Sequence, residues 1–152
     1  MNIRTAQKED VASLVEFNQA MALETEGKRL DFETLRGGVE AVFGDSKKGF
    51  YVIAESDGAI VGGLMVTYEW SDWRNSWFWW IQSVYIMPQL RGKGVYRMLY
   101  DFVKAKAARE KSVCGFRLYV ERENERAQRV YEKLGMEASH YLMYEENISE
   151  NI

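Results

Sequence analysis

Apolar residues recur along this chain at two spacings, which divide it into helices and strands. A spacing of three to four residues predicts amphipathic helices, and apolar stretches bounded by turn residues predict strands. The stretches with helical spacing are residues 8–22, 31–43, 92–110 and 125–134. The stretches that we expect to be strands are residues 3–6, 50–55, 59–68, 77–87, 116–120 and 137–145.

Turn and cap residues support these boundaries. The pair Asp57-Gly58 lies between two predicted strands and is a strong hairpin signal. Asp31 is placed to cap the second helix, and Gly44 to end it. The only proline, Pro88, ends the long apolar strand before it. The boundaries between elements are therefore marked in the sequence itself.

The resulting order of elements is β-α-α-β-β-β-α-β-α-β. Strands joined by both hairpins and crossovers predict an α/β sandwich, with a mixed, mostly antiparallel central sheet and helices on both faces. No repeat and no linker interrupts the chain, and its 152 residues are the length of about one domain. We therefore expect residues 1–152 to form a single domain.

Composition and charge exclude several classes of protein. The net charge is −3 and no block of five like charges occurs, so the usual footprint of nucleic-acid binding is missing. Polar residues interrupt every apolar run before it could span a bilayer, and the first residues lack the apolar segment of a signal peptide. The one cysteine, Cys114, cannot form an internal disulfide. We expect a cytoplasmic protein with no nucleic-acid partner, no membrane partner and no metal.

The strand that ends at Pro88 leads through two glycines into a helix. Gly92 and Gly94 are one residue apart, with Arg91 and Lys93 on either side of the first. The first N–H groups of a helix have no internal partner, and the helix dipole places about half a positive charge there. Glycines let the backbone approach a pyrophosphate, and basic side chains add charge-assisted hydrogen bonds. The segment indicates an anion site, although a simple turn has the same pattern.

Two motifs resemble those of the GNAT superfamily of N-acetyltransferases. The series Gln89-x-x-Gly92-x-Gly94 is similar to the Gln/Arg-x-x-Gly-x-Gly/Ala signature of that superfamily. A second series follows at the expected distance, and its members are Asn124, Ala127, Tyr131, Gly135 and Met136. Met136 stands where the superfamily usually has Phe, which keeps the position apolar. The resemblance extends over residues 3–144, nearly the whole chain.

This resemblance implies an acetyl-CoA-dependent N-acetyltransferase, with a sheet splayed open between the strands around Val84 and Val120. Acetyl-CoA would lie in the gap, where the backbone of Val84 and Ile86 pairs with the pantetheine arm like an added strand. The loop would hold the pyrophosphate, and Asn124, which is also typical of a helix cap, would line the pantetheine. The residues that we expect to bind the cofactor are Val84, Ile86, Gln89, Arg91, Gly92, Lys93, Gly94, Val95, Asn124 and Ala127.

Tyr131 lies one helical turn after Ala127, so the two residues share a face of the helix. The resemblance implies that Tyr131 is the general acid that protonates the departing thiolate. Reference pKa values near 10 for tyrosine and 8.5 for a thiol make complete proton transfer uphill by about 2 kcal/mol. Hydrogen bonding to the developing thiolate therefore matters as much as the transfer. The alternative is a tyrosine buried in the core.

The acceptor amine must lose a proton before it attacks the thioester. The superfamily often has a Glu on the strand before the pyrophosphate loop, where this sequence has Gln82, which cannot act as a base. Water or another carboxylate would take that role. Two segments with acidic residues, 24–31 and 69–73, could bind a small cationic amine, and the second also contains Trp70 and Trp73, although solvated surface charge is the common alternative. The candidate substrate-binding residues are Glu24, Glu26, Asp31, Trp70, Asp72 and Gln82, with Glu69 as a further carboxylate.

All five tryptophans lie between Trp70 and Trp80. In a strand, Trp77 and Trp79 face one way and Phe78 and Trp80 the other, so both faces are bulky. This favours a core strand between two helical layers. The alternative is an exposed apolar strip that forms a homodimer contact or an acceptor pocket.

Two other functions fit parts of the sequence. A non-catalytic acyl-CoA-binding or sensing domain would keep the pyrophosphate loop, but Tyr131 argues against it and only Gln82 favours it. An ATP-binding module would use Gly92 and Gly94, but the Lys-Ser/Thr pair of a P-loop is missing because Val95-Tyr96 follows. The predicted partners are therefore acetyl-CoA and a small-molecule amine.

Overall fold

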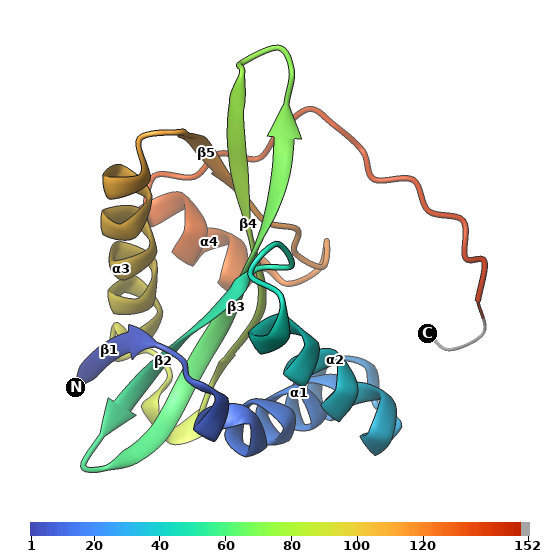
Figure 1. The fold of residues 1–152 in the computed structure, drawn as a ribbon, viewed down its shortest axis with the longest axis vertical. Helices are drawn as coiled ribbons and strands as arrows, with labels where there is room; N and C mark the ends of the chain where they lie inside the picture. The colour runs from blue at the N-terminus through green and yellow to red at the C-terminus, as the bar shows by residue number, and fades with distance from the viewer. Residues whose placement is uncertain (150–152) are drawn as a thin grey trace. The chain divides into compact units, whose positions relative to one another are not determined.

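The computed structural model describes residues 1–149, which divide into two compact units. The first unit, Met1–Tyr119, contains a sheet and its helices, and the second begins at Val120. The elements of the first unit are β1 (Asn2–Thr5), the 3-10 turn η1 (Lys8–Asp10), α1 (Val11–Glu26), α2 (Phe32–Gly44), β2 (Phe50–Ser56), β3 (Ala59–Ser71), β4 (Ser76–Ile86), the 3-10 turn η2 (Pro88–Leu90), α3 (Val95–Glu110) and β5 (Val113–Arg117) (Figure 1). The helix of the second unit is α4 (Glu125–Lys133).

The strands of the first unit form one sheet in the order β1-β2-β3-β4-β5. Strands β1 to β4 pair antiparallel, and β5 joins β4 in parallel after the crossover through α3. Asp57 and Gly58 form the β2–β3 turn with φ angles of 50° and 78°, the left-handed geometry that a tight hairpin needs. The predicted mixed, mostly antiparallel sheet is confirmed.

Helices α1 and α2 cover one face of this sheet, and α3 covers the other (Figure 1). Tyr51 of β2 packs in a buried cluster with Leu14 of α1 and Val39 of α2. The next residue, Val52, points to the opposite face and is fully buried, as is Leu99 of α3. The predicted α/β sandwich is therefore confirmed for this unit.

Strand β5 pairs with only one half of β4. The register runs from Trp77 opposite Val113 to Trp80 opposite Arg117, and it goes no further. Within the described residues, β4 from residue 81 to residue 86 therefore has no β5 neighbour. The sheet is not closed along this edge, in agreement with the expected splay.

The position of β5 differs from the apolar pattern, which predicts residues 116–120. The strand begins at Val113, just after Ser112, whose carbonyl accepts a hydrogen bond from the Trp77 N–H at 2.9 Å. The ends of β5 are therefore decided by its pairing with β4 and not by its own composition.

Two helix boundaries also differ from the prediction. Helix α3 begins at Val95 because Gly92 and Gly94 have φ angles of 77° and 83°, which do not belong to an α-helix. Helix α1 continues to Glu26 and ends at Gly27, whose left-handed conformation caps it. The acidic residues near the end of α1 are therefore helical, although the apolar spacing predicts a helix that ends at residue 22.

The predicted strand at residues 137–145 is wrong. The structure has neither helix nor strand in this segment, which belongs to the second unit. A strand is stable only when a neighbour pairs with its backbone and its apolar face is buried. Here Tyr141, Leu142, Met143 and Tyr144 are 54–91% exposed, so no such burial occurs.

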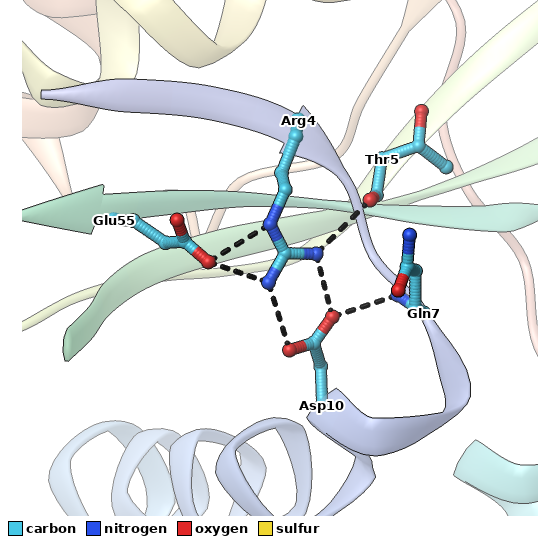
Figure 2. A network of polar contacts seen from close by, with 5 residues as sticks. All are labelled: Arg4, Thr5, Gln7, Asp10 and Glu55. Atoms are coloured by element: carbon cyan, nitrogen blue, oxygen red, sulfur yellow. Dashed lines mark hydrogen bonds and ion pairs between the residues drawn. The ribbon is translucent and has the colours of Figure 1, made fainter. Parts of the chain in front are cut away.

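A network of ion pairs ties β1 to β2 and to the start of α1 (Figure 2). The Arg4 guanidinium donates to both oxygens of Asp10, at 2.8 and 3.0 Å, and to Glu55 at 2.8 Å. The Asp10 side chain is only 8% exposed and also accepts the Gln7 N–H at 2.7 Å. The hydrogen bonds from Arg4 hold the pKa of Asp10 below its ordinary value of 3.8. The network therefore contributes to stability while Asp10 is ionised.

We expect Asp10→Asn to lower the free energy of unfolding by about 1–3 kcal/mol near neutral pH, because it weakens charge-assisted hydrogen bonds at a buried site. The folded-state pKa of Asp10 lies below its unfolded value. Its contribution is therefore complete above the ordinary pKa and is lost as the pH falls through the folded pKa. Urea unfolding of parent and variant, from about pH 7 to about pH 2, should show their difference shrinking.

The matched control is Glu40→Gln, which breaks an exposed ion pair with Arg36 on α2. Such a pair contributes about 0.5 kcal/mol or less. If Asp10→Asn unfolds at the same urea concentration as Glu40→Gln at neutral pH, the network is not a stabilising element.

Candidate active site

The loop between β4 and α3 presents a helix N-terminus without a side-chain cap. Gly94 is the N-cap residue of α3, and no side chain of the described structure hydrogen-bonds to the first turn as its cap. Gly92 and Gly94 both have φ near 80°, where a Cβ atom is unfavourable. The first-turn N–H groups and the positive end of the helix dipole are therefore arranged as in anion sites of other proteins.

The other loop residues offer different groups to a ligand. Lys93, between the two glycines, and Gln89, in the η2 turn, are both exposed. Val95 is 2% exposed and packs in the core, so only its backbone N–H faces the loop. Lys93 supplies charge, Gln89 an amide, and Val95 a backbone donor.

A β-bulge in β4 precedes the loop. Ser83 has a φ of 51°, and the register shifts so that Gln82 pairs with Met65 while Tyr85 pairs with Gly63. Two residues of β4 thus oppose one residue of β3, which changes the alternation of faces. As a result, Gln82 and Tyr85 both point to the face that α1 covers.

Arg91 connects the loop to the end of α1. Its Nε donates to the Ile86 carbonyl at 2.8 Å, and its Nη2 donates to Glu24 at 2.9 Å. The Tyr85 hydroxyl lies 3.4 Å from the other oxygen of Glu24, and the Arg91 guanidinium lies 5.3 Å from the centre of the Tyr85 ring. Burial, followed by the charge of Glu24, raises the pKa of Tyr85. The structure therefore joins one predicted acceptor residue, Glu24, to one predicted cofactor residue, Arg91.

Tyr85 is a member of this group that the sequence analysis missed. Its partners are distant in sequence, and Glu24 is 61 residues away. Its ring also packs on Phe17 of α1, with 5.1 Å between ring centres. No spacing rule connects these positions, so only the folded sheet shows that they meet.

Gln82 and Glu69 lie on the same face of the β3–β4 pair, and both are already hydrogen-bonded. Gln82 donates from Nε2 to the Thr67 hydroxyl at 2.6 Å. Glu69 accepts from Trp80 Nε1 at 2.9 Å and from Arg117 at 2.8 Å. These contacts, that of Trp80 first, hold the pKa of Glu69 below its ordinary value. A carboxylate with a lowered pKa is a weaker base, so Glu69 is poorly suited to take the acceptor's proton.

The remaining acidic candidates, Asp31, Asp72 and Glu26, differ in their local contacts. Asp31 caps α2, as predicted, and accepts the Thr34 N–H at 3.0 Å and the Thr34 hydroxyl at 2.8 Å. These hydrogen bonds lower the pKa of Asp31. Asp72 lies in the β3–β4 turn, where its carbonyl accepts the Asn75 N–H at 3.4 Å. Glu26 is exposed in the last turn of α1.

The tryptophans divide between the core and the surface. Trp79 is 5% exposed, so the core interpretation holds for it, but Trp70, Trp73 and Trp77 are 38–88% exposed. Trp77 and Trp79 also line a cavity of about 700 Å³ beside the C-terminal end of α3. None of the predicted cofactor-binding or substrate-binding residues lines this cavity.

Helix α4, in the second unit, carries the other predicted motif. Asn124 is its N-cap residue, and its side-chain oxygen accepts the Ala127 N–H at 3.1 Å, so the helix-cap role is confirmed. Ala127 and Tyr131 are one turn apart on a common face. Burial raises the pKa of Tyr131 above 10.0. Its hydroxyl is therefore protonated at neutral pH and able to donate a hydrogen bond.

Residues 1–149 contain neither a candidate metal cluster nor a candidate membrane-spanning helix. No three His, Cys, Asp or Glu side chains between residues 1 and 149 gather into a group that could hold a metal ion. No helix in that part of the chain is long and apolar enough to cross a membrane.

Solved structures with the same fold include several acetyltransferases. A "possible acetyltransferase" from Clostridium difficile 630 is 42% identical, with a TM-score of 0.90 and 98% of each chain covered. A "predicted acetyltransferase with acetyl-CoA" from Clostridium acetobutylicum is 18% identical, with a TM-score of 0.78 and 95% of each chain covered. A ribosomal-protein-alanine N-acetyltransferase from Brucella melitensis biovar Abortus 2308 is 20% identical, with a TM-score of 0.75, 97% of this chain covered and 100% of that chain. At such identities the last two show the fold alone.

Among curated proteins, none matches the chain. The model of the acetyltransferase (GNAT) family matches residues 12–136, which include both the glycine loop and α4. This match covers most of the chain, and the 42% identical structure agrees with it. The chain therefore belongs to the acetyltransferase (GNAT) family and is an acyltransferase.

Proposed function

We propose that this enzyme transfers the acetyl group of acetyl-CoA to a primary amine, and that the acceptor is a small cationic amine. The observation that carries the proposal is the uncapped N-terminus of α3, with Gly92 and Gly94 in left-handed conformations. A pyrophosphate accepts hydrogen bonds from such backbone N–H groups, and Arg91 and Lys93 supply positive charge beside them. The loop therefore fits the phosphates of CoA.

The open edge of β4 fits the pantetheine arm. Val84 and Ile86 lie beyond the last β4–β5 pair, on the part of the strand without a β5 neighbour in the described structure. Pantetheine carries two amide groups on an extended chain, so it can pair with a strand edge as an added strand does. This pairing would bring the thioester alongside the sheet.

The second unit is proposed to complete the reaction. Asn124 and Ala127 would contact the pantetheine, and Tyr131 would donate its proton or a hydrogen bond to the sulfur as the amine forms its C–N bond and the C–S bond breaks. The protonated state of Tyr131 at neutral pH supports this role. The family match runs through both units, which supports treating residues 1–152 as a single acetyltransferase domain.

The acceptor side is proposed to recognise positive charge. Glu24 lies 3.4 Å from the Tyr85 hydroxyl, and the Tyr85 ring packs on that of Phe17. A carboxylate combined with aromatic rings can bind an ammonium group. Glu69 and Gln82 present further oxygen atoms on the same face of the sheet. Because Gln82 cannot accept a proton and Glu69 is a weak base, water is the proposed proton acceptor.

Two further proposals concern the cellular compartment and the oligomeric state of the enzyme. Cys114 is an exposed free thiol, which is typical of a reducing compartment, so we propose that the enzyme works in the cytoplasm. The exposed Trp70 and Trp73 support the alternative of a homodimer contact.

The reaction is tested by release of free thiol from acetyl-CoA in the presence of spermidine, kanamycin or a peptide with an N-terminal alanine. We expect thiol release with at least one cationic small molecule, and an acetylated product by mass spectrometry. Binding of acetyl-CoA without thiol release would favour the alternative of a sensing domain.

The phosphate site is tested by Arg91→Ala. The substitution removes a charge-assisted contact, so CoA should bind about tenfold more weakly, while pantetheine, which lacks the pyrophosphate, should bind unchanged. Calorimetric titration measures both affinities. Arg109→Ala, which removes the same charge from the other end of α3, should change neither. Equal weakening of CoA and pantetheine by Arg91→Ala would show that the residue is structural.

A further inference from the structure

Arg91 is held by two acceptors that differ in kind. The Ile86 carbonyl belongs to the backbone at the end of β4. It lies 2.8 Å from Nε and fixes this inner nitrogen of the guanidinium. The Glu24 carboxylate, 2.9 Å from Nη2, is a charged side chain of α1, 67 residues away in sequence. The guanidinium is therefore anchored at its Nε, while its outer nitrogen is bound by a charge that another anion can replace.

The ion pair with Glu24 is accessible to such an anion. The side chains of Arg91 and Glu24 are 38% and 40% exposed, so water screens their attraction. Arg91 directly precedes Gly92, in the loop where the proposed function places the phosphates of CoA. A phosphate that binds the α3 N-terminus adds more negative charge than one carboxylate, and it fits the planar fork of a guanidinium. The phosphate is therefore the stronger of the two competitors.

We propose that Glu24 and the pyrophosphate of CoA exchange at Arg91, so that cofactor binding frees the Glu24 carboxylate for the ammonium group of the acceptor. This inference rests on the proposed function, because it takes the CoA phosphates to lie at the glycine loop. It assigns to Glu24 a second role, that of a competitor for the cofactor site in the free enzyme.

The surroundings of Glu24 suit an ammonium group once Arg91 is drawn away. Tyr85 is 8% exposed, and its hydroxyl lies 3.4 Å from Glu24. Its ring packs at 5.1 Å on that of Phe17. In this structure the Arg91 guanidinium lies 5.3 Å from the centre of this ring and supplies the positive charge. An acceptor ammonium would replace one cation with another, so the site favours acetyl-CoA first and the amine second.

The inference is tested by Glu24→Gln, which keeps the size of the side chain and removes the competing charge. CoA should bind the variant about two- to fivefold more tightly than the parent, because an exposed ion pair of this kind no longer has to be broken. Pantetheine, which has no pyrophosphate to compete for Arg91, should bind parent and variant equally. The matched control is Glu26→Gln, which removes the same charge from the same turn of α1.

A double-mutant cycle identifies Arg91 as the shared partner. In the Arg91→Ala background, Glu24→Gln should leave the affinity for CoA unchanged, since nothing remains for the two anions to share. For the amine with the highest turnover among those named above, Glu24→Gln should raise KM about tenfold with little change in kcat. Glu16→Gln, at an exposed position earlier on α1, should change neither KM nor kcat.

Three results would overturn the exchange. They are unchanged or weaker CoA binding by Glu24→Gln, an equal gain from Glu26→Gln, and a gain that persists in the Arg91→Ala background. Failure of the proposed function gives a different result, because the parent would then bind CoA and pantetheine equally, or release no thiol with any amine.

Discussion

Replacement of Tyr131 by Phe is expected to lower kcat about 10²–10⁴-fold, the usual effect of removing a positioned general acid. The affinity for acetyl-CoA should stay nearly the same, because the ring is kept and only the hydroxyl is lost. An interaction made only with the departing thiolate belongs to the transition state, so kcat and kcat/KM should fall together. Steady-state kinetics and calorimetric titration with CoA measure the two effects separately.

The pH profile gives an independent check on Tyr131. Burial raises its pKa above 10.0, so its hydroxyl is protonated throughout the neutral range. Loss of rate through its ionisation should therefore begin only above about pH 10. This basic limb should be missing in Tyr131→Phe. The control is Tyr141→Phe, at an exposed position in the same unit. Turnover of Tyr131→Phe within about threefold of the parent, with chemistry rate-limiting, would assign the proton to water or to the acceptor itself.

The parts of the fold that the sequence predicted well depend on local chemistry. Asp31 caps α2 and Asn124 caps α4 because each side chain reaches an N–H group three residues ahead. The Asp57-Gly58 turn is also decided locally, because both residues adopt the left-handed conformation that a tight hairpin needs. Positions of this kind are decided within a few residues of sequence and can be identified before the fold is known.

The parts that were missed depend on partners far away in sequence. Arg91 was correctly placed in the loop, but its ion pair with Glu24 joins residues 67 positions apart. The apolar pattern of residues 137–145 predicts a strand, yet a strand exists only where another strand pairs with it. The β5 boundaries were displaced for the same reason. Pairing and ion-pair partners are properties of the folded chain, so no local pattern specifies them.

The candidate site shows the same division. An anion site could be predicted at the glycines and basic residues of the loop because their chemistry is local to one turn. The acidic candidates could not be ranked, because the sequence does not show which carboxylates are already engaged. The Asp31 side chain is hydrogen-bonded to Thr34, whereas Glu24 is paired with Arg91 of the glycine loop. The fold thus distinguishes Glu24 from the other acidic candidates by its ion pair with Arg91.

The second large effect is expected from Gly92→Val, which should weaken CoA binding about 100-fold or more. Gly92 has a φ of 77°, a conformation that costs a β-branched residue about 1–2 kcal/mol. The loop would relax toward negative φ, which turns its N–H groups away from the phosphates, and the new side chain would occupy space that the phosphates need. Fold and core packing should survive, since Gly92 is exposed.

The matched control for this strain is Gly58→Val, because Gly58 has a φ of 78° at the β2–β3 turn and open space around it. Both variants should melt below the parent, but only Gly92→Val should lose its response to CoA. At a CoA concentration of about 100 times the parent Kd, binding stabilises the parent by about 2.7 kcal/mol. A variant with a 100-fold higher Kd gains only about 0.4 kcal/mol under the same conditions. Calorimetric melting curves with and without CoA resolve this difference, and a full response in Gly92→Val would place the phosphates of CoA elsewhere on the protein.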